Sequence, residues 1–322
     1  MLRGGVTRGG GGWGPHRRSL NGAAGGCARP ALGLATRRSF GRWHGKLTGL
    51  KKAPPAPPAM STAAILGSAF VGSALFGVGL ATAIVINSKD EVADCDPRCS
   101  CARRVEKFGE LSETYDSTVG KDETVMGLFL LRWWLLRSAR GSVLEVAAGT
   151  GSNIGWYPSH CSEVTLTDAS ASMVAVAQRK VSAEDKYKAQ YVVRRMGVGD
   201  AAKYGAAYDT VVDAFGLCSF DDAVDSLRAM QRACRANGVV LLLEHGRSHY
   251  GWLNDLLDKY ASRHLERWGC SWNRDIVGIC AEAGLEVQTM RRFHFGTTYF
   301  IIAAPHPSLA AKADHAAKEA DA

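Results

Sequence analysis

The sequence has no acidic residue in its first 60 positions and no charged residue of either sign from Ala53 to Ser88. The first 60 residues hold 11 of the 39 Lys and Arg side chains, so the rest of the chain carries 28 basic against 31 acidic side chains. The net charge of +8 therefore belongs to the N-terminus alone. A mildly acidic body lacks the clustered Lys and Arg that phosphate binding needs, which argues against a nucleic-acid-binding main domain.

Residues 1–52 also lack any sustained apolar face, although they contain 14 Gly and eight Arg. An Arg-rich, acid-free composition is typical of a mitochondrial presequence, and only five Ser or Thr residues argue against a plastid transit peptide. We expect processing near Arg37-Arg38-Ser39-Phe40. The alternative is a disordered basic arm that the mature protein keeps.

The charge-free stretch consists of a Pro-rich joint, residues 53–61, and a 26-residue apolar run from Thr62 to Asn87. About 20 such residues cross a bilayer, so the run predicts a single transmembrane helix. A buried helix of a soluble domain is the alternative, but the many small side chains would make a poor core. Lys51 and Lys52 precede the run and a mostly acidic segment follows it. The positive-inside tendency then predicts a single-pass protein of the mitochondrial inner membrane whose body faces the intermembrane space.

Small residues recur every four positions within this predicted span, at Ala69, Ser73, Gly77 and Ala81. They share one helix face, where they would let another membrane helix approach closely. We therefore expect a membrane-protein partner at this face, unless the pattern is incidental to a weakly hydrophobic span.

Nine cysteines in 322 residues are too few for a disulfide scaffold, and most lie in apolar segments where a buried thiol is the default. Cys95, Cys99 and Cys101 stand close together in a predicted linker, residues 88–106. Zinc sites favour C-x2-4-C pairs with a second pair elsewhere, and no His follows nearby. We expect an ordinary linker here, with redox sensitivity as the alternative, and no metal site in the chain.

From Tyr115 onward the sequence alternates helical patterns with short apolar runs, which predicts an α/β fold with a mostly parallel sheet. After a helix at Met126–Ser138, Ser142–Ala148 forms a buried strand that Gly149-Thr150-Gly151 breaks. Two glycines directly after a strand let the backbone turn tightly and approach a ligand. The next strand, Val164–Asp168, ends in an acid of the kind that binds ribose hydroxyls in nucleotide-binding sheets.

The glycine spacing distinguishes two classes of ligand. A dinucleotide site needs a third glycine where Ile154 stands, and Gly155 comes one residue late. Glu145 lies four residues before Gly149 and is out of place beside a pyrophosphate. It suits the ammonium and sulfonium charges of S-adenosylmethionine. A plain turn is the alternative, but the turn and both acids occur together.

The sequence thus resembles the class I S-adenosylmethionine-dependent methyltransferases (methyltransferase type 11 like) over residues 107–305. Their motif acid-x-Gly-x-Gly-x-Gly is matched from Glu145 to Gly151, with Ala147 in place of the first glycine. The resemblance implies a Rossmann-like seven-stranded sheet with helices on both faces, an antiparallel last strand and S-adenosylmethionine as cofactor. Residues 306–322 form a C-terminal tail. The resemblance assigns the cofactor to Glu145, Ala147, Gly149, Gly151, Asp168, Asp200, Ala201 and Phe215.

A closer likeness lies in three segments, Phe215–Ser219, Leu243–Ser248 and Trp268–Asp275. With the presequence and span, they resemble methyltransferase-like proteins anchored in the mitochondrial inner membrane. They are more distantly similar to membrane-bound thiol methyltransferases. The expected later elements are strands at 208–215, 239–244, 288–293 and 298–303, and helices at 221–236 and 275–283.

Methyl transfer from a sulfonium requires alignment and exclusion of water, and a base only where the acceptor arrives protonated. His245, at the carboxyl end of the fifth strand, is our candidate base, although a lone His is more often structural. Tyr115 and Asp116 lie on the segment before the first helix, which resembles the lid that many of these enzymes fold over the cofactor. The alternative is an ordinary helix cap. Trp272 and Cys218 are candidates for lining the substrate pocket. The alternative for Trp272 is a structural role in the hydrophobic core.

The sequence supports two alternative hypotheses about function. The first is a membrane-anchored methyltransferase with a small or lipophilic substrate, such as a quinone precursor or a thiol. The second is an assembly or stability factor for a respiratory complex, with little or no turnover. The largely intact cofactor motifs favour the first.

Overall fold

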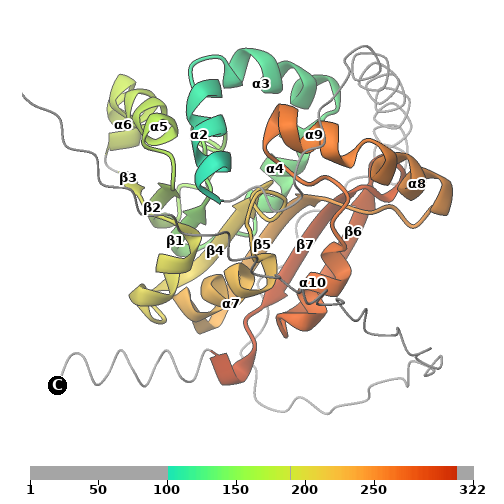
Figure 1. Cartoon of the computed structure of the whole chain (residues 1–322). Coiled ribbons are helices and arrows are strands. Elements are labelled where there is room, and N and C mark those ends of the chain that lie inside the picture. Colours follow the sequence, from blue (N-terminus) through green and yellow to red (C-terminus); the bar gives the residue numbers. More distant parts are fainter. Residues whose placement is uncertain (1–100, 189, 310–322) are drawn as a thin grey trace, which may run out of the picture. The chain divides into compact units, whose positions relative to one another are not determined.

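The computed structural model describes residues 101–188 and 190–309 (Figure 1). The predicted presequence, Pro-rich joint and transmembrane span lie outside the described residues, as do the small-residue face, Cys95, Cys99 and most of the C-terminal tail. In the described ranges, no helix combines the length and apolar character that a membrane crossing requires.

Seven strands form one sheet in the order β3-β2-β1-β4-β5-β7-β6, which confirms the predicted sheet. The first five strands pair in parallel, and β7 runs antiparallel to both β5 and β6. This order places the carboxyl ends of β1 to β5 along one edge. The strands are β1 (Gly141–Val146), β2 (Cys161–Asp168), β3 (Tyr191–Arg195), β4 (Tyr208–Ala214), β5 (Cys234–His245), β6 (Glu286–Phe293) and β7 (Thr298–Ala304).

Helices cover both faces of the sheet because each face presents a separate apolar cluster. One cluster joins β1, β4, β5 and β7 to α7 (Ala223–Ala233) and α10 (Ile276–Glu282). The other joins the opposite face to α4 (Leu128–Leu136) and α5 (Ala171–Ala183). Figure 1 shows α7 and α10 below the sheet, and α2 (Cys101–Leu111), α3 (Tyr115–Val125) and α9 (Ala261–Trp268) above it. The remaining helices are α6 (Asp185–Lys188), α8 (Gly251–Lys259) and the 3-10 segments η1 (Val198–Tyr204) and η2 (His294–Gly296).

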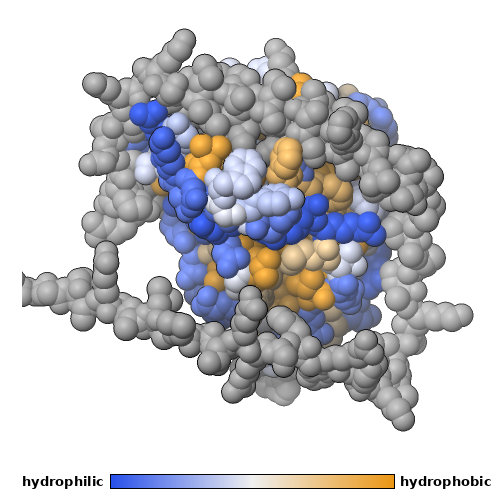
Figure 2. Space-filling model, turned by 90° about the vertical axis from the view of Figure 1, so that its right-hand side faces the viewer, coloured by the Kyte–Doolittle hydropathy of each residue, from blue (hydrophilic) through white to orange (hydrophobic). Residues whose placement is uncertain are grey.

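The edge strand β6 is largely exposed, and its charged side chains discourage pairing with another chain. It carries the exposed Glu286 and Arg291 as well as the exposed Val287. Figure 2 looks onto the β6 side of the domain, where hydrophilic side chains lie between apolar ones.

Two features of the fold differ from the sequence-based expectation. Helix α7 ends at Ala233, and β5 begins at Cys234, five residues before the predicted strand. The predicted helix stop, Asn237-Gly238, instead lies in an irregular start of β5, where the pairing register with β4 shifts. The second difference concerns Tyr115, which is the first residue of α3 and does not precede the first helix.

Candidate active site

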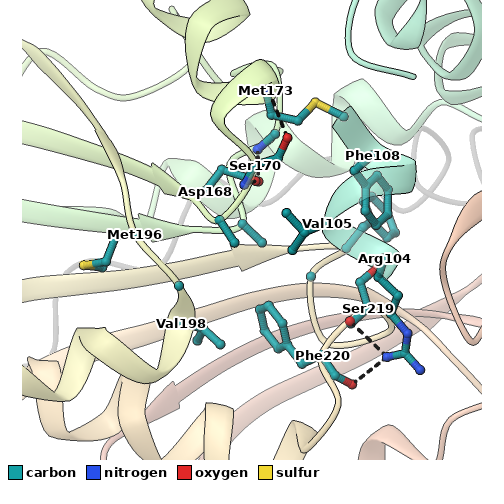
Figure 3. A pocket seen from close by; sticks show the side chains of 16 residues that line it. Arg104, Val105, Phe108, Asp168, Ser170, Met173, Met196, Val198, Ser219 and Phe220 are labelled. Atoms are coloured by element: carbon teal, nitrogen blue, oxygen red, sulfur yellow. Dashed lines mark hydrogen bonds between the residues drawn. The ribbon is translucent and has the colours of Figure 1, made fainter. Parts of the chain in front are cut away.

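A pocket lies where β1, β2, β3 and β4 end, and helix α2 forms its remaining wall (Figure 3). The strand ends and the loops after them contribute Gly149, Asp168, Val198 and Phe215, and α2 contributes Phe108. Open α/β sheets bind their ligands at this edge, because the loops after parallel strands converge there.

The turn after β1 has the left-handed backbone that its sequence predicts. Gly149 and Gly151 have φ of 56° and 79°, and Ala147 has φ of 48°. A Cβ on Gly151 would lie 2.5 Å from Cδ1 of Ile154, whereas a Cβ on Gly149 would meet nothing within 4 Å. The backbone at Gly149 therefore faces open space, where a ligand can approach it closely.

Ala147 holds a backbone conformation that costs a residue with a Cβ about 1–2 kcal/mol. Replacing Ala147 with Gly relieves this strain, but it adds about 0.5–1 kcal/mol of unfolded-state entropy. We expect a net stabilisation of about 0.5–1 kcal/mol and a higher Tm of the full chain in detergent. Ala148→Gly is the matched control and should lower Tm, since Ala148 is buried and has no positive φ. A lower Tm for both variants would contradict the strain at Ala147.

Asp168 ends β2 and lines the pocket, at the place predicted for it. The N–H of Gly149 donates to its Oδ2 at 3.0 Å, and the N–H of Ser170 donates to its Oδ1 at 2.8 Å. Burial raises the pKa of this carboxyl, and the two N–H groups offset part of the rise. The two bonds fix the carboxylate at the pocket, and each oxygen keeps a lone pair for a ligand hydroxyl.

Glu145 lies in β1 and does not line the described pocket. Its carboxylate accepts hydrogen bonds from the Tyr157 hydroxyl at 2.5 Å and from Nδ2 of Asn153 at 2.9 Å. Burial raises its pKa to about 7, although Tyr157, Arg132 and Asn153 each lower it. Its predicted contact with the cofactor's charges stays a prediction. The structure gives Glu145 partners in a buried network.

Asp200 and Ala201, which the resemblance assigns to the adenine, do not line the described pocket. Asp200 pairs with Lys203 at 2.6 Å, and Ala201 is buried in the core. The pocket is lined instead by Met196 and Val198, which sequence reasoning missed. They follow β3, the one strand that the sequence analysis left unidentified.

Helix α2 is the main feature that the sequence did not predict. It begins at Cys101, within the predicted linker, and its Arg104, Val105 and Phe108 line the pocket. Arg104 is 6% exposed and donates from Nη1 to the carbonyl oxygens of Ser219 at 3.0 Å and Phe220 at 3.1 Å (Figure 3). These bonds join α2 to the loop after β4.

The predicted lid residues lie beside the glycine turn. Asp116 accepts a hydrogen bond from Oγ1 of Thr150 at 2.6 Å and pairs with Lys180 at 2.6 Å. Tyr115 does not line the pocket, and burial raises its pKa. Asp116 thus connects α3 to the glycine turn and to α5.

Two predicted residues, Cys218 and His245, come together with Cys270, which sequence reasoning did not select. One ligand atom of each lies within 4.8 Å of the others. The predicted Trp272 stacks on His264 at 4.0 Å between ring centroids, and Nε2 of His264 lies 3.1 Å from Sγ of Cys270. We call Cys218, His245 and Cys270 the Cys/His cluster.

The Cys/His cluster adjoins the pocket through the loop after β4. The rings of Phe215 and His245 are 5.6 Å apart, and Phe215, Gly216 and Ser219 line the pocket around Cys218. A hydrogen bond from Cys270 and the charge of His245 lower the pKa of Cys218 well below its usual value. Burial alone would lower the pKa of His245, but Cys218 raises it.

A buried pair of carboxyl groups lies at the ends of the two central strands, behind this cluster. Asp213 of β4 and Glu244 of β5 are both fully buried. Burial raises the pKa of each carboxyl well above its usual value, and the nearby Cys218 raises both further. Asp213 also raises the pKa of Glu244, whereas the hydrogen bond with Glu244 lowers that of Asp213. A neutral carboxyl group in this pair avoids placing two like charges in the interior.

The pocket suits S-adenosylmethionine on the geometry of its own residues. The fixed carboxylate of Asp168 is placed for ribose hydroxyls, and the open backbone at Gly149 leaves room beside it. Met196 and Val198 offer apolar side chains for a flat base.

Comparison with known proteins agrees with this geometry. The chain matches the family model described as a methyltransferase domain over residues 120–290, just over half of its length. It is 36% identical over 211 residues to the Saccharomyces cerevisiae protein named Methyltransferase OMS1, mitochondrial, covering 61% of this chain and 45% of that protein. It is 32% identical over 149 residues to a phosphatidylethanolamine N-methyltransferase of Cereibacter sphaeroides, covering 46% of this chain and 71% of that enzyme.

Among solved structures, an O-methyltransferase family protein from Burkholderia thailandensis superposes with a TM-score of 0.52 at 14% identity. The match covers 73% of this chain and 70% of that one, and shows a shared fold. The chain spans less than half the length of the yeast relative. The family match, the sheet and the pocket show that the chain belongs to the class I methyltransferases, enzymes whose cofactor is S-adenosylmethionine.

Proposed function

We propose that this chain is a membrane-anchored methyltransferase of the mitochondrial inner membrane that acts on a small or lipophilic substrate. In this proposal the presequence directs import, residues 62–87 span the membrane, and the catalytic domain faces the intermembrane space. The name of the yeast relative includes a mitochondrial location, and the Cereibacter relative is named for a phospholipid headgroup. Both names support the proposal.

The observation that carries the proposal is the position of α2. This helix lines the pocket with Arg104, Val105 and Phe108, and 13 residues separate its start from the end of the predicted span at Asn87. Thirteen residues reach about 45 Å at full extension. If residues 62–87 span the membrane as proposed, this short connection would keep the pocket close to the bilayer surface. A substrate dissolved in the membrane would be at high local concentration there.

The residues of the chain align the reaction and keep water out. Asp168 would hold the nucleoside end of the cofactor, and Met196 and Val198 would pack on it. S-adenosylmethionine supplies an electrophilic methyl group on a good leaving group. Because the displacement is in line, the acceptor must approach from the side opposite the departing sulfur. Phe108 of α2 and Phe215 after β4 exclude water from the pocket between them.

Purified full-length chain in liposomes tests the proposal. Methyl-labelled S-adenosylmethionine and a mitochondrial extract, separated into lipid and aqueous fractions, should give label chiefly in the lipid fraction. Deleting residues 62–87 should leave cofactor affinity unchanged, because the pocket residues are all retained. The same deletion should lower lipid labelling at least about tenfold, since the local concentration at the membrane is lost.

Carbonate extraction of mitochondria is the matched control for the anchor. The full chain should stay in the membrane pellet, and the deleted chain should be extracted. Label found only in the aqueous fraction, or equal lipid labelling by both chains, would contradict a membrane-delivered substrate.

A further inference from the structure

The Cys/His cluster brings three potential metal ligands together from distant parts of the chain. Cys218 follows β4, His245 ends β5, and Cys270 follows α9. The N–H of Ser271 donates to the carbonyl oxygen of Cys218 at 2.9 Å, which holds the segment of Cys270 against the loop after β4. Gly269 ends α9 with φ of 72° and turns the chain toward that loop.

The spacing of the ligand atoms suits a tetrahedral ion. Zinc binds sulfur at about 2.3 Å and nitrogen at about 2.0–2.1 Å, so two sulfurs on one ion lie about 3.8 Å apart. The three ligand atoms here all lie within 4.8 Å of one another. A movement of about 1 Å, within the reach of side-chain torsions, brings them to bonding distance.

A second observation points to a ligand at this place. Nε2 of His245 is buried and has no hydrogen-bond partner among the described residues. Cys218 and Cys270 are 1% and 8% exposed. A buried nitrogen without a partner is costly, and a metal ion between it and the two sulfurs would supply the missing interaction.

The charge and the chemical softness of these three ligands indicate which metal ion the cluster would bind. Two thiolates and a divalent cation sum to zero, which suits a buried site better than two bare thiolates. Thiolate and imidazole ligands favour Zn²⁺ over Mg²⁺ or Ca²⁺, which prefer oxygen. We propose that Cys218, Cys270 and His245 form a zinc site beside the cofactor pocket, with a fourth coordination position left for another ligand. His264 supports this site by its contact with Cys270, as partners of metal-binding residues commonly do.

The proposed site departs from two expectations drawn from the sequence. The chain was expected to hold no metal, because the only close cysteines in the sequence were Cys95, Cys99 and Cys101. The fold instead joins residues up to 52 positions apart. His245 was expected to act as a base, but a nitrogen bound to zinc has no lone pair left to accept a proton.

Metal analysis of the full-length chain, purified without added chelator, tests the site. To remove a competing set of thiols, the background is the triple variant Cys95→Ser, Cys99→Ser and Cys101→Ser. This background should retain about one zinc per chain. Adding Cys218→Ser, Cys270→Ser or His245→Asn should lower the zinc content at least about tenfold. Cys280→Ser removes an equally buried cysteine outside the cluster and should retain the metal.

Cobalt substitution decides the question even where a variant fails to fold. Co²⁺ added to metal-free background protein should give a thiolate-to-metal absorption band that zinc abolishes. A folded background protein that shows neither zinc nor this band would overturn the site. So would zinc that survives both cysteine changes, or a Cys218–Cys270 disulfide that leaves two thiols fewer on titration. None of these measurements depends on methyl transfer, so they are independent of the proposed substrate.

Discussion

Replacing Asp168 with Ala should weaken S-adenosylmethionine binding by roughly 2–4 kcal/mol, which corresponds to a loss of about 30- to 1,000-fold in affinity. The carboxylate is partly buried and fixed by the N–H groups of Gly149 and Ser170. It would bind two ribose hydroxyls through charged hydrogen bonds in a site of low water content. The variant loses both bonds and also releases the two N–H groups of the turn. Isothermal titration calorimetry with the full chain measures the loss.

Asp200→Ala is the control for this experiment. The sequence places both acids at the cofactor, but Asp200 pairs with Lys203 outside the described pocket. Its removal should change the affinity by less than about 1 kcal/mol, the range of an exposed ion pair. Equal losses from the two variants would mean that the nucleoside contacts η1 as much as the end of β2.

Arg132→Met should destabilise the protein by about 3–5 kcal/mol, because it removes one partner from a buried charge network. The Arg132 side chain is 7% exposed and donates to both carboxylate oxygens of Glu123, at 3.1 Å and 2.7 Å. It also donates to Oδ1 of Asn153 at 3.1 Å, and Asn153 in turn binds Glu145. In the variant, the carboxylates of Glu123 and Glu145 thus lose the only cationic neighbour that the described residues give them in this network. The Tm should fall by about 10 °C.

The destabilisation should depend on pH. Burial raises the pKa of Glu145 to about 7, and Arg132 holds it below a still higher value. Without Arg132 this pKa rises further, so the folded variant keeps a proton that the unfolded chain has lost. Stability of the variant therefore falls as pH rises from about 5.5 to 8, and the difference from wild type is larger at pH 8. Arg137→Ala, an exposed site at the end of α4, should change Tm little at either pH. A pH-independent loss from Arg132→Met would contradict the charge network.

Most of the sheet was predictable because its strands are buried on both faces and end in recognisable turns. The runs Ser142–Ala148 and Thr298–Ala303 are mostly apolar, and the observed strands β1 and β7 fall within one or two residues of them. Gly149 and Asp168 were also predictable, since a glycine turn and an acid at a strand end have local causes. Their hydrogen bond, across 19 residues, then follows from the parallel pairing of β1 and β2.

The rest depends on contacts that no local pattern encodes. Arg104 occupies a buried position only because Ser219 and Phe220, 115 and 116 residues away, present their carbonyl oxygens to it. By sequence alone a charged residue in a linker is expected at the surface. Cys270 likewise has an ordinary apolar setting in the sequence, and its place beside Cys218 arises from the turn after α9.

The position of Arg104 also bears on how fast the enzyme can exchange its cofactor. A ligand that leaves by the α2 side must first separate that helix from the loop after β4, which breaks two hydrogen bonds to Arg104 and uncovers Val105 and Phe108. Under the proposed function, departure of the spent cofactor would then be a gated event, slower than diffusion out of an open cleft. A first turnover faster than those that follow is the kinetic pattern that such a gate produces.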